Sequence, residues 1–255
     1  MGGNETKINP NTSKALSFTR ARVKDPLNYY LGNQKTTEAG CCKYLGIIIL
    51  SDLSWADKVN YTVQKAWRAL HFVMCIVKEG NKNTKSLAYT SLVRPILEYG
   101  AACWDPYRKC QISALGRVQN KAAKFVHHLR GSDWESVAQH RKIAHMCALY
   151  KAYTGQRAWK AIGVRLQAPN YLSRLDYYWK IRARKQRTDI GKCSFVNRSI
   201  ANRNKLPEGA IGISHGKTHN FKTRVRKVKT SEWKWRCWKA KSEVKWSELQ
   251  ICVSK

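Results

Sequence analysis

Apolar residues recur at helical spacing in the first half of the chain. Between Val59 and Val77 they stand three or four positions apart, which is the repeat of a helix that buries one face. Ser54-x-x-Asp57 has the form of a capping box, in which the serine hydroxyl accepts from a free backbone N–H. Gly80 is a typical helix stop. We therefore predict a helix that begins after Ser54 and ends before Gly80.

Three further helices are expected behind the first. Thr84 is expected to cap the second, and Pro95 to kink or end it, because proline removes a backbone donor and clashes with the preceding turn. Apolar spacing predicts a third helix over residues 112–129. Asp133 is expected to cap a fourth helix over residues 134–153.

The segments outside these helices carry weaker signals. Residues 14–23 alternate in part between apolar and polar side chains, which predicts a strand, with residues 27–31 as its hairpin partner. Residues 44–50 are apolar and β-branched, which predicts a buried strand. Beyond Gly163 the pattern weakens, and only residues 220–229 show the spacing of a short basic helix.

These elements predict an α+β fold that is mainly α. Residues 1–52 are expected to hold a small β part with a hairpin, and residues 53–160 a helical bundle. Residues 161–230 are expected to form a basic C-terminal region. Residues 231–255 are rich in Trp and Lys without regular spacing, so we expect this tail to be disordered. The 255 residues are 43% hydrophobic, which is enough to bury a core.

Net charge adds the first functional signal. The chain carries 48 basic and 16 acidic side chains, a formal charge of +32, and half of the excess lies after residue 173. Such an excess is typical of proteins that bind a polyanion, either nucleic acid or an anionic membrane. There is no apolar run of about 20 residues and no signal peptide. The nine cysteines are scattered and do not indicate a secreted disulfide framework, so we expect an intracellular protein of the nucleus or cytoplasm.

Two basic clusters in the C-terminal third are candidates for phosphate contacts. Trp residues of the tail stand close behind the second cluster and could stack on bases. The alternative is a solvated basic face that binds any polyanion weakly. The candidate residues are Arg182, Arg184, Lys185 and Arg187 in the first cluster, and Lys222, Arg224, Arg226 and Lys227 in the second.

Cysteines and histidines between Cys103 and Cys147 include both types of zinc ligand. Their spacing fits no common zinc knuckle or finger. Cys103 and Cys147 also stand in helical apolar patterns, which favours core thiols. We therefore expect no metal site, no catalytic residue and no cofactor.

Short motifs follow one another in a fixed order along the chain. They are Lys43-Tyr44-Leu45-Gly46, Leu53-Ser54-Trp55, Arg94-Pro95-Ile96-Leu97-Glu98-Tyr99-Gly100, Trp104-Asp105-Pro106, Asn204-Lys205-Leu206-Pro207 and Phe221-Lys222. In order and spacing this series resembles the end of the palm, the thumb and the C-terminal region of reverse transcriptases from non-LTR retrotransposons, especially the jockey-like LINE group. One departure is Arg203, which stands where that family usually has Trp.

The resemblance implies descent from an RNA-directed DNA polymerase, whose substrate is an RNA template with a DNA primer. It implies that Lys43, Tyr44 and Gly46 belong to the hairpin that grips the primer end. It also implies that Lys14 lies near the incoming nucleotide. Residues 1–52 would then be the end of the palm, and residues 53–160 the thumb that holds the duplex through its phosphates.

The chain contains no Asp-Asp pair and no Tyr-x-Asp-Asp motif. Polymerases transfer phosphoryl groups with two metal ions that clustered carboxylates hold. We therefore expect a truncated reverse transcriptase that is not an enzyme on its own but retains binding of RNA and DNA. Mg²⁺ would belong only to the full-length ancestral polymerase.

Two alternatives remain open from the sequence. Gly2 stands in a pattern that fits N-myristoylation, and one acyl chain with a polybasic surface can hold a protein on an anionic membrane. The other alternative is an inert fragment, because its strands would lack the rest of a palm sheet.

Overall fold

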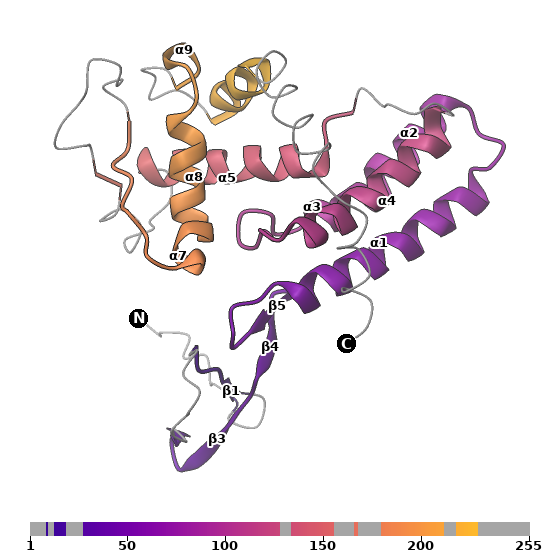
Figure 1. Ribbon diagram of the computed structural model, residues 1–255. Helices are drawn as coiled ribbons and strands as arrows, with labels where there is room; N and C mark the ends of the chain where they lie inside the picture. The colour runs from indigo at the N-terminus through magenta and orange to yellow at the C-terminus, as the bar shows by residue number, and fades with distance from the viewer. Residues whose placement is uncertain are drawn as a thin grey trace, which may run out of the picture.

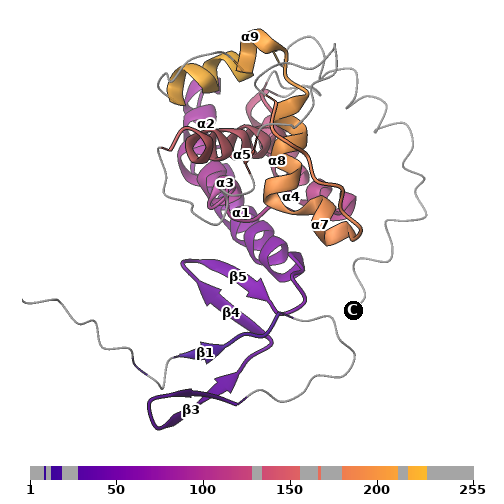
Figure 2. The ribbon, with the colours of Figure 1, turned by 90° about the vertical axis from the view of Figure 1, so that its left-hand side faces the viewer.

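A computed structural model shows an α+β fold that is mainly α, as the sequence predicted (Figure 1). Small β-sheets lie at one end and helices form the rest of the molecule (Figure 2). The predicted disorder of residues 231–255 falls outside the described residues. The structure describes residues 9, 13–18, 28–127, 134–155, 166–167, 180–211 and 218–228.

The first sheet has three short strands in the order β1-β3-β2. β1 (Lys14–Ala15) runs parallel to β3 (Gln34–Glu38), and β2 (Tyr29–Leu31) runs antiparallel to β3. Among the described residues β1 and β2 each pair with β3 and not with each other, which differs from the predicted hairpin of residues 14–23 with residues 27–31. Residues 19–27 lie outside the described part of the chain. The partner of β2 follows it directly, because Gly32 adopts φ +62° and allows a tight turn.

The second sheet is a hairpin of β4 (Cys41–Tyr44) and β5 (Ile47–Leu50). The sequence predicted one continuous strand over residues 44–50, and this is wrong. The chain reverses at Leu45 and Gly46, which adopt φ +46° and φ +74°. Glycine reaches this left-handed region without steric cost, so the turn forms there although apolar residues continue on both sides. The hairpin that the resemblance implied around Lys43–Gly46 is present.

Helix α1 (Ala56–Ile76) follows as predicted, but its first turn differs. Trp55 occupies the N-cap position and makes no side-chain cap, so the predicted capping box is wrong. Instead Asp52 Oδ1 accepts from the Ser54 N–H at 2.8 Å, and Ser54 Oγ accepts from the Ala56 N–H at 3.3 Å. Ser54 therefore still accepts from the first free amide of α1, but without the return bond from Asp57 that a capping box requires.

The second predicted helix is built from three consecutive parts. They are α2 (Lys82–Ala88), the π-helical turn η2 (Tyr89–Val93) and α3 (Arg94–Glu98). Asn81, and not Thr84, is the cap, because its Oδ1 accepts from the Thr84 N–H at 2.8 Å. Pro95 does not end the helix. The preceding π turn relaxes the backbone where proline would otherwise clash with the carbonyl one turn earlier.

The third and fourth helices are α4 (Lys109–His127) and α5 (Val137–Tyr153). The cap of α5 is Ser136, which forms a reciprocal capping box with Gln139, so the predicted cap at Asp133 is wrong. The largest core lies between α1, α2–α3 and α4. Its fully buried members include Ala66, Leu70, Val93, Leu97, Trp104, Val118 and Ala122.

Most of the C-terminal helices pack on α5, and the first of them packs on the second. They are α7 (Asp189–Cys193), α8 (Phe195–Asn204), α9 (Glu208–Ile211) and a helix over residues 218–228, which confirms the basic helix predicted at 220–229. The sequence predicted no helix over α7 to α9. A second core joins Ile143, Met146 and Tyr150 of α5 to Leu206, Ile211, Phe221 and Val225.

One buried ionic cluster connects the two parts of the helical region. Asp105 lies in the loop behind α3 and accepts from Arg141 of α5 at 2.8 Å and from Arg198 of α8. Arg141 is 2% exposed, donates to the Leu97 carbonyl at 2.9 Å and stacks on Trp104 at 4.0 Å. Burial lowers the pKa of Arg141, and Asp105 opposes that shift. Asp105 therefore compensates a charge that would otherwise be buried alone.

Candidate nucleic-acid interface

The turn of the β4–β5 hairpin is attached to the helices by two side chains. Lys58 of α1 donates from Nζ to the Gly46 carbonyl at 2.8 Å. Tyr99, the residue that follows α3 in the chain, donates from its hydroxyl to the Leu45 carbonyl at 2.9 Å. Both contacts reach backbone atoms of the turn itself, so the tip of the hairpin is held in a fixed position against α1 and α3.

Two glycines allow this close approach. A Cβ on Gly46 would lie 3.3 Å from Tyr99 Cε1, and a Cβ on Gly100 would lie 3.2 Å from Ile47 Cδ1. Gly100 also has φ +63°, where a side chain is strained. The turn and the end of α3 therefore contact each other because neither carries a side chain at these positions.

Lys58 lies under the hairpin among aromatic rings. It is 4% exposed, and its Nζ lies 5.2 Å from the ring centroid of Trp104, 5.6 Å from Tyr61 and 5.9 Å from Tyr99. Burial is the main cause that lowers the pKa of Lys58, and the charges of Arg141, Lys65 and Lys43 lower it further. The ring faces and the Gly46 carbonyl offset part of this desolvation.

The outer surface of the hairpin carries one cation and exposed apolar groups. Tyr44 is 64% exposed and Leu45 is 72% exposed. Lys43 is exposed, and its Nζ lies 5.3 Å from the ring centroid of Tyr61. A cation beside an exposed ring on a fixed turn can contact a phosphate and the adjoining sugar together.

Lys14 lies on a different sheet. It is exposed on β1, where it pairs in register with Thr37 of β3. The hairpin residues Lys43, Tyr44 and Gly46 are on the neighbouring β4–β5 sheet (Figure 2). The structure thus groups three of the four N-terminal candidates and leaves Lys14 on a separate sheet.

The first C-terminal cluster lies on an extended segment before α7. Arg182, Arg184, Lys185 and Arg187 are all exposed. The segment is anchored next to them, because Asn204 of α8 accepts from the Ile181 N–H at 3.1 Å and donates to its carbonyl at 2.7 Å. These four cations therefore project from a backbone that α8 holds.

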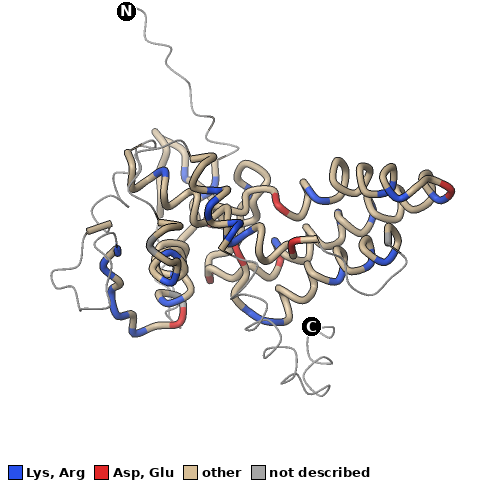
Figure 3. The backbone as a smooth tube through the Cα atoms, turned by 90° about the horizontal axis from the view of Figure 1, so that it is seen from above, with Lys and Arg blue, Asp and Glu red and all other residues tan. Residues whose placement is uncertain are grey.

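The second C-terminal cluster lies on the helix over residues 218–228. Lys222, Arg226 and Lys227 are exposed, whereas Arg224 is half-buried. Arg226 lies 3.7 Å from Glu135. Figures 1 and 2 both place this helix at the end of the molecule opposite the hairpin. The predicted basic residues therefore form separate groups, and Figure 3 shows further Lys and Arg distributed along the helices between them.

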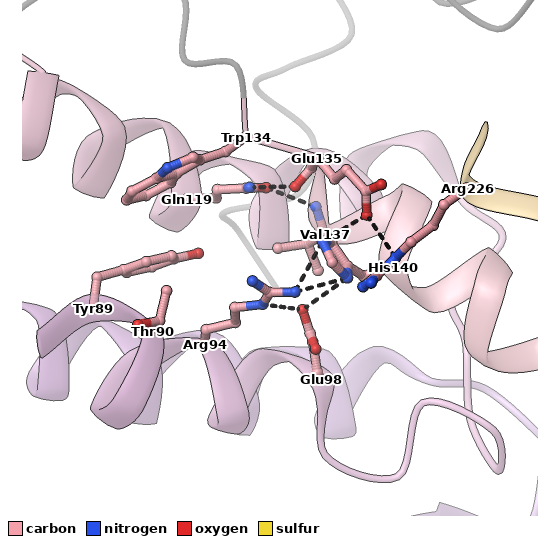
Figure 4. A pocket seen from close by; sticks show the side chains of 10 residues that line it. All are labelled: Tyr89, Thr90, Arg94, Glu98, Gln119, Trp134, Glu135, Val137, His140 and Arg226. Atoms are coloured by element: carbon pink, nitrogen blue, oxygen red, sulfur yellow. Dashed lines mark hydrogen bonds and ion pairs between the residues drawn. The ribbon is translucent and has the colours of Figure 1, made fainter. Parts of the chain in front are cut away.

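A cavity of about 350 Å³ lies between η2–α3, the start of α5 and Arg226 (Figure 4). Arg94 pairs with Glu98 at 2.7 Å, and His140 lies 3.1 Å from Glu135. Two arginines and two glutamates thus line the cavity. Their charges largely cancel, so the cavity has little net charge to attract an anion. The Tyr89 hydroxyl also lines the cavity, and burial raises its pKa to about 12, so it stays protonated.

Sequence reasoning missed the residues that hold the hairpin. Lys58 stands in the helical pattern of α1 as a polar residue beside Val59, and nothing in the spacing predicts that it is buried. Tyr99 was within a motif of the resemblance but had no assigned role. The prediction that Cys103 is a core thiol is wrong, because Cys103 is exposed in the loop after α3.

No protein-family model, curated protein or solved structure matches the chain. Among the described residues, no group of three or more His, Cys, Asp or Glu side chains could hold a metal ion. No helix within the described ranges is both long and apolar enough to cross a membrane. Gly2 and the tail tryptophans lie outside the described residues.

Proposed function

We propose that this protein binds nucleic acid of the template–primer type, an RNA–DNA duplex, through the β4–β5 hairpin and the adjoining helices. We further propose that it descends from a non-LTR retrotransposon reverse transcriptase and has no polymerase activity of its own. The observation that carries the binding proposal is the anchored turn, where Lys58 and Tyr99 hold the backbone at Leu45 and Gly46 while Lys43 and Tyr44 remain exposed.

The hairpin turn is already held in place before any ligand binds. A surface loop loses conformational entropy when it binds, whereas a turn that is already held by two side chains loses less. The exposed cation then contributes phosphate contact, and the overall charge of +32 supplies long-range attraction to a polyanion. The C-terminal cations contribute further phosphate contacts that do not depend on sequence.

Absence of polymerase activity is proposed from the sequence. The 255 residues contain no Asp-Asp pair, and two-metal phosphoryl transfer requires clustered carboxylates. The expected result is no primer extension by the pure protein with Mg²⁺ or Mn²⁺. Extension above background would contradict this part of the proposal and leave the binding part standing.

The binding test is a salt titration with a labelled RNA–DNA duplex. Affinity should fall steeply from low to physiological salt, because each neutralised phosphate releases a counterion. Lys43→Gln with Tyr44→Ala should weaken binding. The matched control is Lys35→Gln with Tyr30→Ala, a facing pair on the other sheet in which Tyr30 is also 64% exposed. Equal losses in both double variants, or a flat salt response, would overturn the proposal.

A further inference from the structure

The outer face of α1 carries a stripe of two cations between two aromatic rings, to which the proposed function assigns no contact of its own. Tyr61, Lys65, Arg68 and Phe72 stand four, three and four positions apart, which places them on one face of the helix. Tyr61 is 39% exposed and Phe72 is 60% exposed. Lys65 and Arg68 are exposed between them. We call these four residues the α1 stripe.

The stripe is continuous with the hairpin. Lys43 of β4 lies with its Nζ 5.3 Å from the ring centroid of Tyr61, which is the first member of the stripe. From this contact α1 runs away from the sheets, as Figure 1 shows. A ligand held by the hairpin can therefore extend along α1 without leaving a surface of rings and cations.

The charge on this face favours a polyanion. From residue 58 to residue 78 the helix and its end contain no acidic side chain. Within the described part of the chain, no carboxylate forms an ion pair with Lys65 or Arg68. A protein partner would have to supply carboxylates between apolar side chains at matching intervals. Nucleic acid supplies both kinds of group in its own repeat, with bases for the two rings and phosphates for the two cations between them.

The exposed rings distinguish an unpaired strand from a duplex. In a duplex the faces of the bases are covered by neighbouring base pairs, so Tyr61 and Phe72 have no free base to stack on. In a single strand every base has a free face. The two rings are eleven residues apart, which is about 16 Å along the helix at 1.5 Å per residue. A stacked strand with a rise of 3.4 Å per base covers this distance with roughly five bases.

We propose that the α1 stripe binds a single-stranded segment of nucleic acid that continues from the hairpin, with Tyr61 and Phe72 stacking on bases and Lys65 and Arg68 contacting phosphates. This inference rests on the proposed function and adds the strandedness of the ligand. It assigns to α1 a role beyond supporting the hairpin.

The test measures fluorescence anisotropy with a labelled 12-nucleotide single strand and a 12-base-pair RNA–DNA duplex. Phe72→Ser, at the member of the stripe farthest from the hairpin, should weaken single-strand binding by about tenfold and leave duplex binding nearly unchanged. The control is Tyr30→Ser, which removes one exposed ring from β2. Phe72→Leu removes the ring but keeps an apolar side chain that should not disturb folding. Weaker single-strand binding by this variant would therefore come from lost stacking and not from a folding defect.

Charge is tested in the same assay. Lys65→Gln with Arg68→Gln should weaken the salt dependence of single-strand binding more than Lys121→Gln with Lys124→Gln, which removes the same charge from exposed positions of α4. Two results would overturn the inference: unchanged single-strand affinity in the ring variant, or equal losses for strand and duplex. If the wild-type protein binds neither ligand, the proposed function fails first.

Discussion

The two halves of the described chain present different surfaces to solvent. Up to Ile112, exposed cations stand near exposed rings, as at Lys43 with Tyr61 and at Arg68 with Phe72. Beyond Ile112, none of the described residues is an exposed large hydrophobic side chain, although exposed cations continue as far as Lys227. The first half can combine stacking with charge, whereas the described part of the second half offers charge.

Because of this difference, we expect the two halves to contribute to the proposed binding in different ways. Stacking has an optimal geometry, and the first half fixes that geometry through the Lys58 and Tyr99 contacts to the hairpin turn. Phosphate contacts from the second half tolerate any sequence and weaken with salt. The more basic half is therefore expected to add affinity, and the less basic half to position the ligand.

The largest expected effect is a loss of folding stability when the ion pairs between the two halves are broken. Asp105→Asn removes the carboxylate that Arg141 and Arg198 share, and leaves the buried Arg141 charge without compensation. Loss of one partner of a buried ion pair costs about 3–5 kcal/mol. Urea unfolding should show a loss of this size, and it should exceed that of Asp189→Asn, whose ion pair with Lys192 is exposed. Equal stabilities of the two variants would contradict the role assigned to Asp105.

The next largest effect concerns the hairpin alone. Gly46→Ala places a side chain at φ +74°, with a Cβ 3.3 Å from Tyr99 Cε1. The strain should cost about 1–2 kcal/mol and loosen the turn. Hydrogen exchange of the amides from Cys41 to Leu50 should become faster, whereas Gly116→Ala, which has open space on α4, should leave it unchanged. A hairpin whose exchange is unaffected would show that its turn is not anchored as described.

The sequence predicted the first half better than the second because its signals there are local. Apolar spacing found α1 and α4, but it predicted one strand across the hairpin tip, which only the resemblance implied. The caps were wrong at Ser54 and Asp133, because Trp55 and Ser136 occupy the N-cap positions. Lys58 could not be found, because its burial depends on a hairpin twelve residues earlier and on Tyr99.

In the second half the packing partners are distant in the chain. Helix α8 carries one arginine at a buried position and another at a half-buried position, where an apolar pattern would be expected. Arg203 is 3% exposed and lies over the Tyr153 ring at 5.2 Å, and Arg198 reaches back to Asp105. Such buried cations hide the helical pattern of α8 in the sequence. The predicted helix at residues 220–229 was found because Phe221 and Val225 are apolar and buried.

A smaller effect should appear with pH. His145 of α5 is buried with Nε2 2.5 Å from the Ala101 carbonyl, and burial is the main cause that lowers its pKa. Its neutral form stabilises the fold above the ordinary histidine pKa of about 6.5, and this stability is lost as pH falls from there toward the lowered pKa. Urea unfolding between pH 7.5 and 5 should therefore show declining stability, and His145→Gln should reduce the decline. A pH profile unchanged by the substitution would contradict this assignment.

The smallest expected effect tests the second half. Arg184→Gln with Lys185→Gln should weaken binding of single strands and duplexes alike, because the cations contact phosphates. The slope of log affinity against log salt should fall by up to about two units. A selective loss for one ligand would show that this segment does more than contact phosphates.

The most direct test of the account is photo-crosslinking of the wild-type protein to a labelled RNA–DNA duplex with a single-stranded extension, followed by peptide mapping. The account predicts crosslinks from the duplex to residues 41–50 and from the extension to residues 61–72, with weaker and salt-sensitive crosslinks to residues 182–187. Crosslinks confined to residues 180–228, or their absence at residues 41–72, would contradict it.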